Sequence, residues 1–198
     1  MIMQPNILNQ LLKYPKYVLT IRELMAILGV KRSSAIVQAS RLVKQGLLIT
    51  AGRNLFLVAL KPIDWLAVAV EMYSPSYISL DSALNFHGLI DQIPKPIFLC
   101  TTRRPLKKSI VTQEFVYRNV ADSLFFGFQR QGNTIIALPE KALLDQLYFA
   151  HRRSVSFHAD EINFKAINWD RLFEFAKHFP NTIQKEIFSV YRQNDNSR

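Results

Sequence analysis

The sequence predicts an α+β protein in which a small N-terminal winged helix-turn-helix precedes a larger mixed α+β domain. Three observations predict this class. Three short amphipathic helical patterns open the chain, two β-prone runs follow them, and strand-like and helical segments then alternate. The 198 residues are 49% hydrophobic and include only six glycines, so both parts have enough apolar residues for a core. We place the domain boundary between residues 1–61 and residues 62–198.

The first two helices are predicted by apolar periodicity and by their end signals. Apolar residues recur at helical spacing between Pro5, which suits a first-turn position, and Pro15. The second helix begins after Thr20, which forms a capping box with Glu23, and it ends before Gly29. The pattern therefore predicts two short helices in close succession.

A third helix is predicted to start at Ser33 or Ser34 as its cap and to stop at Gly46. Its inward face is expected to consist of Ala35, Ile36, Ala39, Leu42 and Val43. Its outward face is expected to carry Ser34, Gln38, Arg41 and Gln45. Such side chains reach base edges in a major groove, and the flanking cations Lys31, Arg32 and Lys44 suit phosphates. An ordinary solvated face would have the same polar character, and that alternative stays open.

A β-hairpin is predicted directly after the third helix. Residues 47–50 and 55–60 are β-prone, and the segment 51–54 between them holds a glycine, Arg53 and Asn54. Three helices followed by a hairpin with a basic tip form a winged helix, in which Arg53 can enter a minor groove. Winged helices also serve as protein-docking modules.

The charge distribution favours DNA over a protein partner. The formal net charge is +10, and residues 1–61 contain nine Lys or Arg against one acid, which is a net charge of +8. The remaining residues contain sixteen basic against fourteen acidic side chains. A basic excess in one small module is expected of a surface that displaces counterions from phosphates. The residues expected to contact DNA are Lys31, Arg32, Ser33, Ser34, Gln38, Arg41, Lys44 and Arg53.

The second domain is predicted to mix helices and strands. Helices are expected at 65–72, at 80–86 after the cap Ser79 and before Gly88, and at 140–151 after Pro139. Strands are expected at 96–102, 113–119, 124–130 and 134–138, the last two joined by a turn at 131–133. Residues 160–192 are expected to be helical, with Asn168 or Asp170 capping one helix and Pro180 opening another.

No catalytic or metal-binding pattern is present in the sequence. No acid stands two positions before a lysine, as restriction-type nucleases require, and no Asp-x-Asp pair offers the ligands of a nucleotidyltransferase. The four histidines lack the pairing and the cysteine neighbours of a zinc site: His87, His151, His158 and His178. Cys100 lies inside an apolar run and is expected to be a buried small hydrophobe. We therefore expect no enzyme activity, no cofactor and no metal.

Two basic clusters in the second domain are candidate surfaces for a partner protein or nucleic acid. One is expected in the loop after a strand and consists of Arg103, Arg104, Lys107 and Lys108, and the other is the pair Arg152 and Arg153. Solvated loop charges would look the same. A further candidate contact patch consists of Phe125, Phe126, Phe128, Phe173, Phe175 and Phe179, although most of these are expected to be core.

Cysteine content and hydropathy predict the compartment. Cys100 is the single cysteine, so no internal disulfide can form, as is typical of a reducing cytoplasm. No apolar run approaches the roughly 20 residues of a spanning helix, and Lys13 and Lys16 interrupt any secretory signal. We expect a cytoplasmic protein without a membrane partner.

The sequence resembles the AbiEi-type antitoxins of type IV toxin-antitoxin systems, which act in abortive infection. Two common winged-helix blocks contribute, residues 20–29 (TIRELMAILG) and 41–47 (RLVKQGL). The specific part is three blocks in order, 77–89 (YISLDSALNFHGL), 125–127 (FFG) and 137–145 (ALPEKALLD). The family's wing often has glycine where this chain has Asn54, which tolerates the left-handed backbone of such a turn.

This resemblance implies a transcriptional autorepressor and antitoxin. The winged helix would bind the operator DNA of its own operon, and the C-terminal domain would oppose a nucleotidyltransferase toxin encoded beside it, with or without direct binding. An alternative function is an effector-responsive winged-helix transcription factor, with a ligand-binding C-terminal domain and no toxin partner.

Overall fold

The computed structural model describes residues 5–153 and 155–195 and is a mixed α+β protein with two sheets. The predicted α+β class is confirmed. The chain divides into two compact units, Met1–Met72 and Tyr73–Arg198. The first unit extends past the expected boundary at residue 61 because helix α4 (Trp65–Met72) is tied to it. The Glu71 carboxylate accepts hydrogen bonds from the backbone N–H groups of Tyr17 and Val18, both at 2.8 Å.

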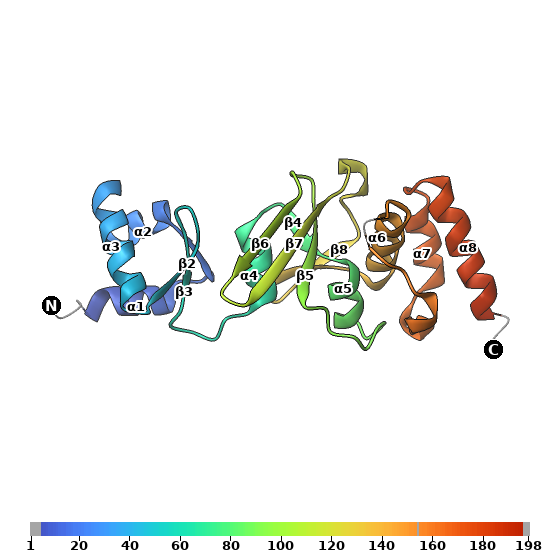
Figure 1. Ribbon diagram of the computed structural model, residues 1–198, viewed down its shortest axis with the longest axis horizontal. Coiled ribbons are helices and arrows are strands. Elements are labelled where there is room, and N and C mark those ends of the chain that lie inside the picture. The colour runs from blue at the N-terminus through green and yellow to red at the C-terminus, as the bar shows by residue number, and fades with distance from the viewer. Residues whose placement is uncertain (1–4, 154, 196–198) are drawn as a thin grey trace. The chain divides into compact units, whose positions relative to one another are not determined.

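The N-terminal unit combines helices with a three-stranded antiparallel sheet (Figure 1). The sheet order is β1-β3-β2, so the short first strand pairs with the far strand of the hairpin. Strand β1 was not predicted from the sequence. The elements before α4 are α1 (Pro5–Lys13), β1 (Val18–Thr20), α2 (Ile21–Leu28), α3 (Arg32–Lys44), β2 (Leu48–Gly52) and β3 (Leu55–Val58).

Helix α2 begins and ends as its sequence predicts. The Thr20 hydroxyl accepts a hydrogen bond from the Glu23 N–H at 3.1 Å, and the Glu23 carboxylate accepts one from the Thr20 N–H at 2.8 Å. Gly29 ends the helix with a φ of 64°, where a side chain would be strained. Both the capping box and the C-terminal glycine are confirmed.

Helix α3 begins earlier than predicted. Lys31 is its N-cap residue, without a side-chain cap hydrogen bond, so neither Ser33 nor Ser34 caps it. The Ala35 N–H donates to the Lys31 carbonyl at 2.9 Å and closes the first turn. Ala35, in this first turn, is fully buried. The predicted cap is wrong.

The C-terminal unit is built on a six-stranded mixed sheet. The strand order is β6-β7-β5-β4-β9-β8, with parallel pairing between β5 and β7 and between β4 and β9. The strands are β4 (Ser76–Ile78), β5 (Pro96–Thr101), β6 (Leu106–Ile110), β7 (Gln113–Asn119), β8 (Phe128–Gln131) and β9 (Thr134–Ala137). The helices are α5 (Leu80–Phe86), α6 (Pro139–His151), α7 (Trp169–Ala176) and α8 (Asn181–Asp195), with short 3₁₀ turns at Asp122–Leu124, Ala159–Glu161 and Phe164–Ala166.

Two strand predictions for this unit need correction. Lys107 and Lys108 were expected in a loop after a strand, but they belong to strand β6. This strand lies at the edge of the sheet, so one of its two edges has no neighbouring strand. Lysine side chains are common on such edge strands. The strand expected at 124–130 is limited to β8, because residues 122–124 form a 3₁₀ turn and Gly127 has a φ of 70°.

Helix α6 is the centre of the C-terminal unit. It contacts α5, α7 and α8, and Figure 1 shows α7 and α8 packed side by side next to it. From Glu140 to Leu147 every one of its residues is buried. Pro139 in its first turn and Asn168 as the cap of α7 agree with the sequence.

Within the described residues, no helix has both the length and the apolar character needed to cross a membrane.

Candidate nucleic-acid interface

The exposed side of α3 is the strongest candidate surface in the N-terminal unit. Ala35, Ala39 and Leu42 pack into the core together with Leu24 of α2. The opposite side of the helix bears exposed side chains of two kinds, polar and apolar. They are Arg32, Ser33, Ser34, Ile36, Val37, Ser40, Arg41 and Lys44.

The position of this face around the helix differs from the sequence prediction. Ile36 was expected in the core but is 47% exposed, and Val37 beside it is 51% exposed. Val43 is only partly buried, and Gln38, expected on the outer face, is also partly buried. Alanines at 35 and 39 let the helix approach its neighbours closely, which turns the bulky Ile36 away from the core. Ile36, Val37 and Ser40 were not predicted as surface residues, because isoleucine and valine are typical of the core and serine gives little indication of either environment.

The segment before α3 is a tight turn. Gly29 adopts the left-handed conformation, and the Val30 N–H donates to the Met25 carbonyl at 3.3 Å. Lys31 and Arg32 follow directly, and both are exposed. Without a side-chain cap, the first N–H groups of α3 and these two cations lie together at one end of the helix.

The hairpin after α3 turns at Arg53 and Asn54. Asn54 has a φ of 61°, the left-handed conformation expected from its residue type, and Arg53 is exposed. The Asn54 carbonyl accepts a hydrogen bond from the Ile21 N–H at 3.0 Å, which joins the turn to the start of α2. Strand β1 pairs with β3 and holds the same end of the hairpin. Arg53 is therefore presented from a turn that is fixed to α2.

Not every cation of this unit is available to a ligand. Lys16 pairs with Glu23 at 3.0 Å, and Lys61 donates to the Tyr14 carbonyl at 2.8 Å and lies over the Tyr17 ring. Burial raises the pKa of Glu23, but hydrogen bonds from Thr20, Tyr14 and Lys16 outweigh it and lower the pKa to about 2. Glu23 is thus charged at neutral pH and occupied in local contacts. Among the described residues, no acidic side chain forms an ion pair with the exposed cations of α3 or with Arg53, and these cations form the charged part of the surface.

The basic cluster of the C-terminal unit is less continuous than expected. Arg103 donates to the Ser74 carbonyl at 3.1 Å and lies over the Tyr73 ring, and Arg104 is exposed. Lys107 and Lys108 lie within β6 rather than in a loop, which corrects the prediction. As neighbours on a strand they point to opposite faces of the sheet. Burial lowers the pKa of Lys108, in keeping with its half-buried position.

A buried polar network joins side chains from two of the sequence blocks described above, 77–89 and 137–145. Lys141 and Asp145, one helical turn apart on α6, form an ion pair in which both side chains are fully buried. Asp145 also accepts hydrogen bonds from Tyr77 at 3.0 Å and from Ser79 at 2.7 Å, and Lys141 donates to the Tyr77 hydroxyl at 2.8 Å. The Ser79 hydroxyl is thereby committed to Asp145 and makes no cap hydrogen bond to α5. Every partner is internal, so the network is a structural element.

Cys100 belongs to the same network. Its thiol lies 3.6 Å from Asp145 and is fully buried. Burial, followed by the charge of Asp145, raises the pKa of the thiol well above its ordinary value. The expectation that Cys100 is buried is confirmed, although its thiol has a polar partner in Asp145.

The predicted aromatic patch is divided among three clusters. Phe126 contacts Phe175 and Phe179, whereas Phe125 and Phe128 pack against Tyr77. Phe173 stacks on Phe188 between α7 and α8. Most of these rings thus contribute to packing.

No three His, Cys, Asp or Glu side chains within 5–153 and 155–195 are arranged to hold a metal ion.

No family model matches the chain, and no curated protein matches it.

Proposed function

We propose that the N-terminal unit is a winged helix-turn-helix that binds operator DNA, and that the protein is an autorepressor and antitoxin opposing a nucleotidyltransferase toxin. The observation that carries the DNA-binding half is the exposed, basic and acid-free face of α3 beside a hairpin tipped by Arg53. The element order α1-β1-α2-α3-β2-β3 is also the order of winged helix-turn-helix domains. In that fold the third helix enters the major groove.

The side chains on α3 suggest a division of labour on DNA. Arg41 and the serines of the exposed face can donate to base edges, and Ile36 and Val37 offer methyl groups that suit the methyl of thymine. Lys31, Arg32 and Lys44 would neutralise phosphates. Arg53 at the hairpin tip would enter the neighbouring minor groove. In this proposal Val37 is one of the residues that contact bases. Gln38 is partly buried and lies at the edge of that group.

The affinity for DNA upstream of the gene tests this half of the proposal. We expect Arg41→Ala and Arg53→Ala to weaken binding by about 10- to 100-fold each, because each removes a groove contact. Lys44→Ala should weaken binding to all sequences and reduce the slope of log affinity against log salt by about 1. Fluorescence anisotropy at several salt concentrations gives both quantities.

The matched control is Lys165→Ala, an exposed lysine of the C-terminal unit that lies outside the proposed surface. It changes the net charge equally and should leave affinity unchanged. Unchanged binding in both arginine variants would contradict the assignment of α3 and the hairpin.

The antitoxin half rests on the resemblance of the C-terminal sequence blocks, and growth rescue tests it. We expect full-length protein to restore growth to cells that express a neighbouring nucleotidyltransferase gene of demonstrated toxicity. The Arg41→Ala/Arg53→Ala double variant, expressed from an unrelated promoter, should rescue as well, because it removes only operator binding. Failure of the wild-type protein to rescue would exclude the antitoxin function. If the wild-type protein rescues growth and the double variant does not, protection from the toxin depends on DNA binding.

A second candidate function is an effector-responsive transcription factor without a toxin partner. A pocket of about 500 Å³ in the C-terminal unit favours it, since this volume is typical of small-molecule sites. The absence of a nucleotidyltransferase gene next to this one would favour the second function over the first.

A further inference from the structure

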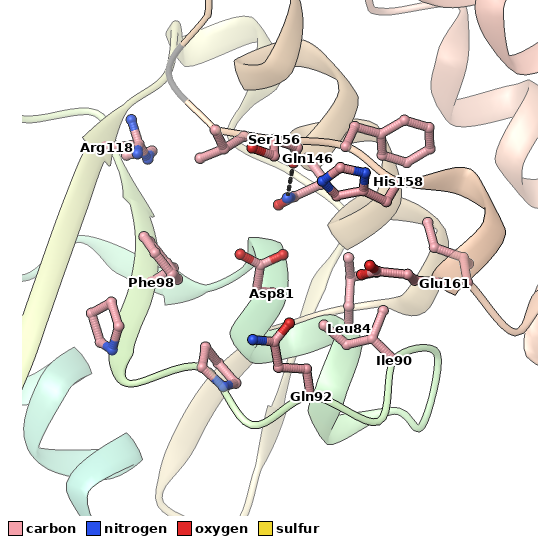
Figure 2. Close-up of a pocket in the computed structure, with 15 residues that line it drawn as sticks. Asp81, Leu84, Ile90, Gln92, Phe98, Arg118, Gln146, Ser156, His158 and Glu161 are labelled. Carbon is pink, nitrogen blue, oxygen red and sulfur yellow. Dashed lines mark hydrogen bonds between the residues drawn. The ribbon is translucent and has the colours of Figure 1, made fainter.

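The pocket between α5, β5, β7 and the segment after α6 is lined by both polar and apolar side chains. Asp81 of α5 and Gln146 of α6 line its middle, and Figure 2 shows their polar ends pointing toward each other. Arg118 of β7 lies on one side, and His158 and Glu161 lie on the other. The apolar part of the pocket wall includes Leu84, Ile90 and Ile162.

The Gln146 amide has an unused acceptor. Its side chain is 4% exposed, and its Nε2 donates to the Ser156 carbonyl at 2.8 Å. Among the described residues, none donates a hydrogen bond to its Oε1, although the atom is buried. A buried acceptor without a donor costs free energy, so a ligand N–H at this point would be stabilised.

The Asp81 carboxylate is a second acceptor in the same place. Burial is the largest influence on it and raises its pKa, and the charge of Arg118 and a hydrogen bond from Gln146 only partly oppose this. The pocket therefore holds a partly buried carboxylate whose charge is incompletely compensated by its neighbours. A cationic donor beside it would supply the missing compensation.

The charges around the pocket favour a cation over an anion. Two carboxylates, Asp81 and Glu161, line it against one guanidinium. Arg118 already lies over the rings of Phe98 and Phe149 and interacts with other groups of the protein. The apolar wall suits a short hydrocarbon chain.

We propose that this pocket binds a small organic cation, an alkylammonium or alkylguanidinium compound, whose N–H groups donate to Asp81 and to Gln146 Oε1. The inference goes beyond DNA binding and antitoxicity, and it is tested on the full-length protein without DNA. Its failure and the failure of the proposed function are therefore distinguishable.

Calorimetric titration with butylammonium, butylguanidinium, butanol and butyrate tests the charge requirement. We expect at least one cation to bind saturably with an affinity of about millimolar, as suits a fragment of this size, and neither butanol nor butyrate to bind. Asp81→Asn should weaken cation binding at least tenfold. Asp122→Asn, at an exposed acid remote from the pocket lining, should leave it unchanged. Binding of butyrate or butanol equal to that of the cations, or no saturable cation binding, would overturn the proposal.

The pH dependence gives a readout that needs no Asp81 variant. Cation binding requires charged Asp81, so affinity should be full above the raised pKa of this group and fall as pH drops through it. His158, Glu161 and Arg118 face the same space, and protonation of His158 would also repel a cation. The titration is therefore repeated with His158→Gln, in which the fall at acid pH should persist. Affinity that does not change with pH in that variant would overturn the role of Asp81.

Discussion

Lys141→Met should destabilise the C-terminal unit by about 3–5 kcal/mol, a loss typical of breaking a buried ion pair by removing one partner. Lys141 and Asp145 are both fully buried, so methionine would leave the Asp145 carboxylate in the core with only neutral donors. Tyr77 would keep its bond to Asp145 but lose the charged donor to its own hydroxyl oxygen. The cost arises from an uncompensated charge rather than from a lost volume, because methionine fills most of the lysine site.

Urea unfolding followed by the fluorescence of Trp169 measures this effect. Trp65 and Trp169 are the two tryptophans, one in each unit, so a Trp65→Phe background makes the fluorescence specific for the C-terminal unit. The matched control is Lys177→Met, which removes an exposed pair with Glu174. We expect that control to change the free energy of unfolding by less than about 1 kcal/mol. Equal effects of the two substitutions would contradict the importance of burial.

A double variant separates charge from packing. Lys141→Met/Asp145→Leu removes both charges, and buried pairs replaced by apolar residues are often as stable as before. Here the hydroxyls of Tyr77 and Ser79 would lose an acceptor, at about 1–3 kcal/mol for each group left unpaired. We therefore expect the double variant to recover only part of the stability lost by Lys141→Met. Full recovery would mean that the hydroxyls find other partners.

The sequence predicted those elements whose ends carry local chemistry. Thr20 with Glu23, Gly29, Asn54 and Asn168 all adopt the expected roles, because a cap or a tight turn involves only neighbouring residues. The side chains expected on the α3 surface were partly misplaced, since apolar character assigned Ile36 to the core. Tertiary packing on Ala35 and Ala39 decided its orientation, and a single helix pattern does not contain that information.

The candidate sites of the C-terminal unit were harder to predict for the same reason. Lys107 and Lys108 resemble loop residues in sequence, yet pairing with β7 makes them part of an edge strand. No structural role was assigned to Lys141 or Asp145 from the sequence, yet they compensate each other in the core. Asp81 and Gln146 belong to different helices, and only the packing of α5 on α6 brings them into one pocket. Contacts between distant segments decide the strand position of the two lysines, the burial of the α6 pair and the assembly of the pocket.

Gly127→Ala should cost about 2–5 kcal/mol, because this glycine meets two constraints at once. Its φ of 70° is strained for any residue with a Cβ, at about 1–2 kcal/mol. A Cβ at this position would also lie 3.0 Å from the Cβ and Cγ of Lys141 and 3.1 Å from the Phe175 ring. Those Lys141 atoms belong to a fully buried side chain held by Asp145, so they cannot yield cheaply, and overpacking typically adds about 1–3 kcal/mol.

Gly132→Ala isolates the contribution of crowding. Gly132 has a φ of 59° in the turn between β8 and β9, and a Cβ there would meet nothing within 4 Å. It should cost only the backbone strain, about 1–2 kcal/mol, in the same Trp169 unfolding experiment. The difference between the two glycines then measures how rigidly the Lys141 stem is held. If the two alanine variants are equally stable, the segment 125–127 can move away from α6, and the buried pair is less closely covered than the structure indicates.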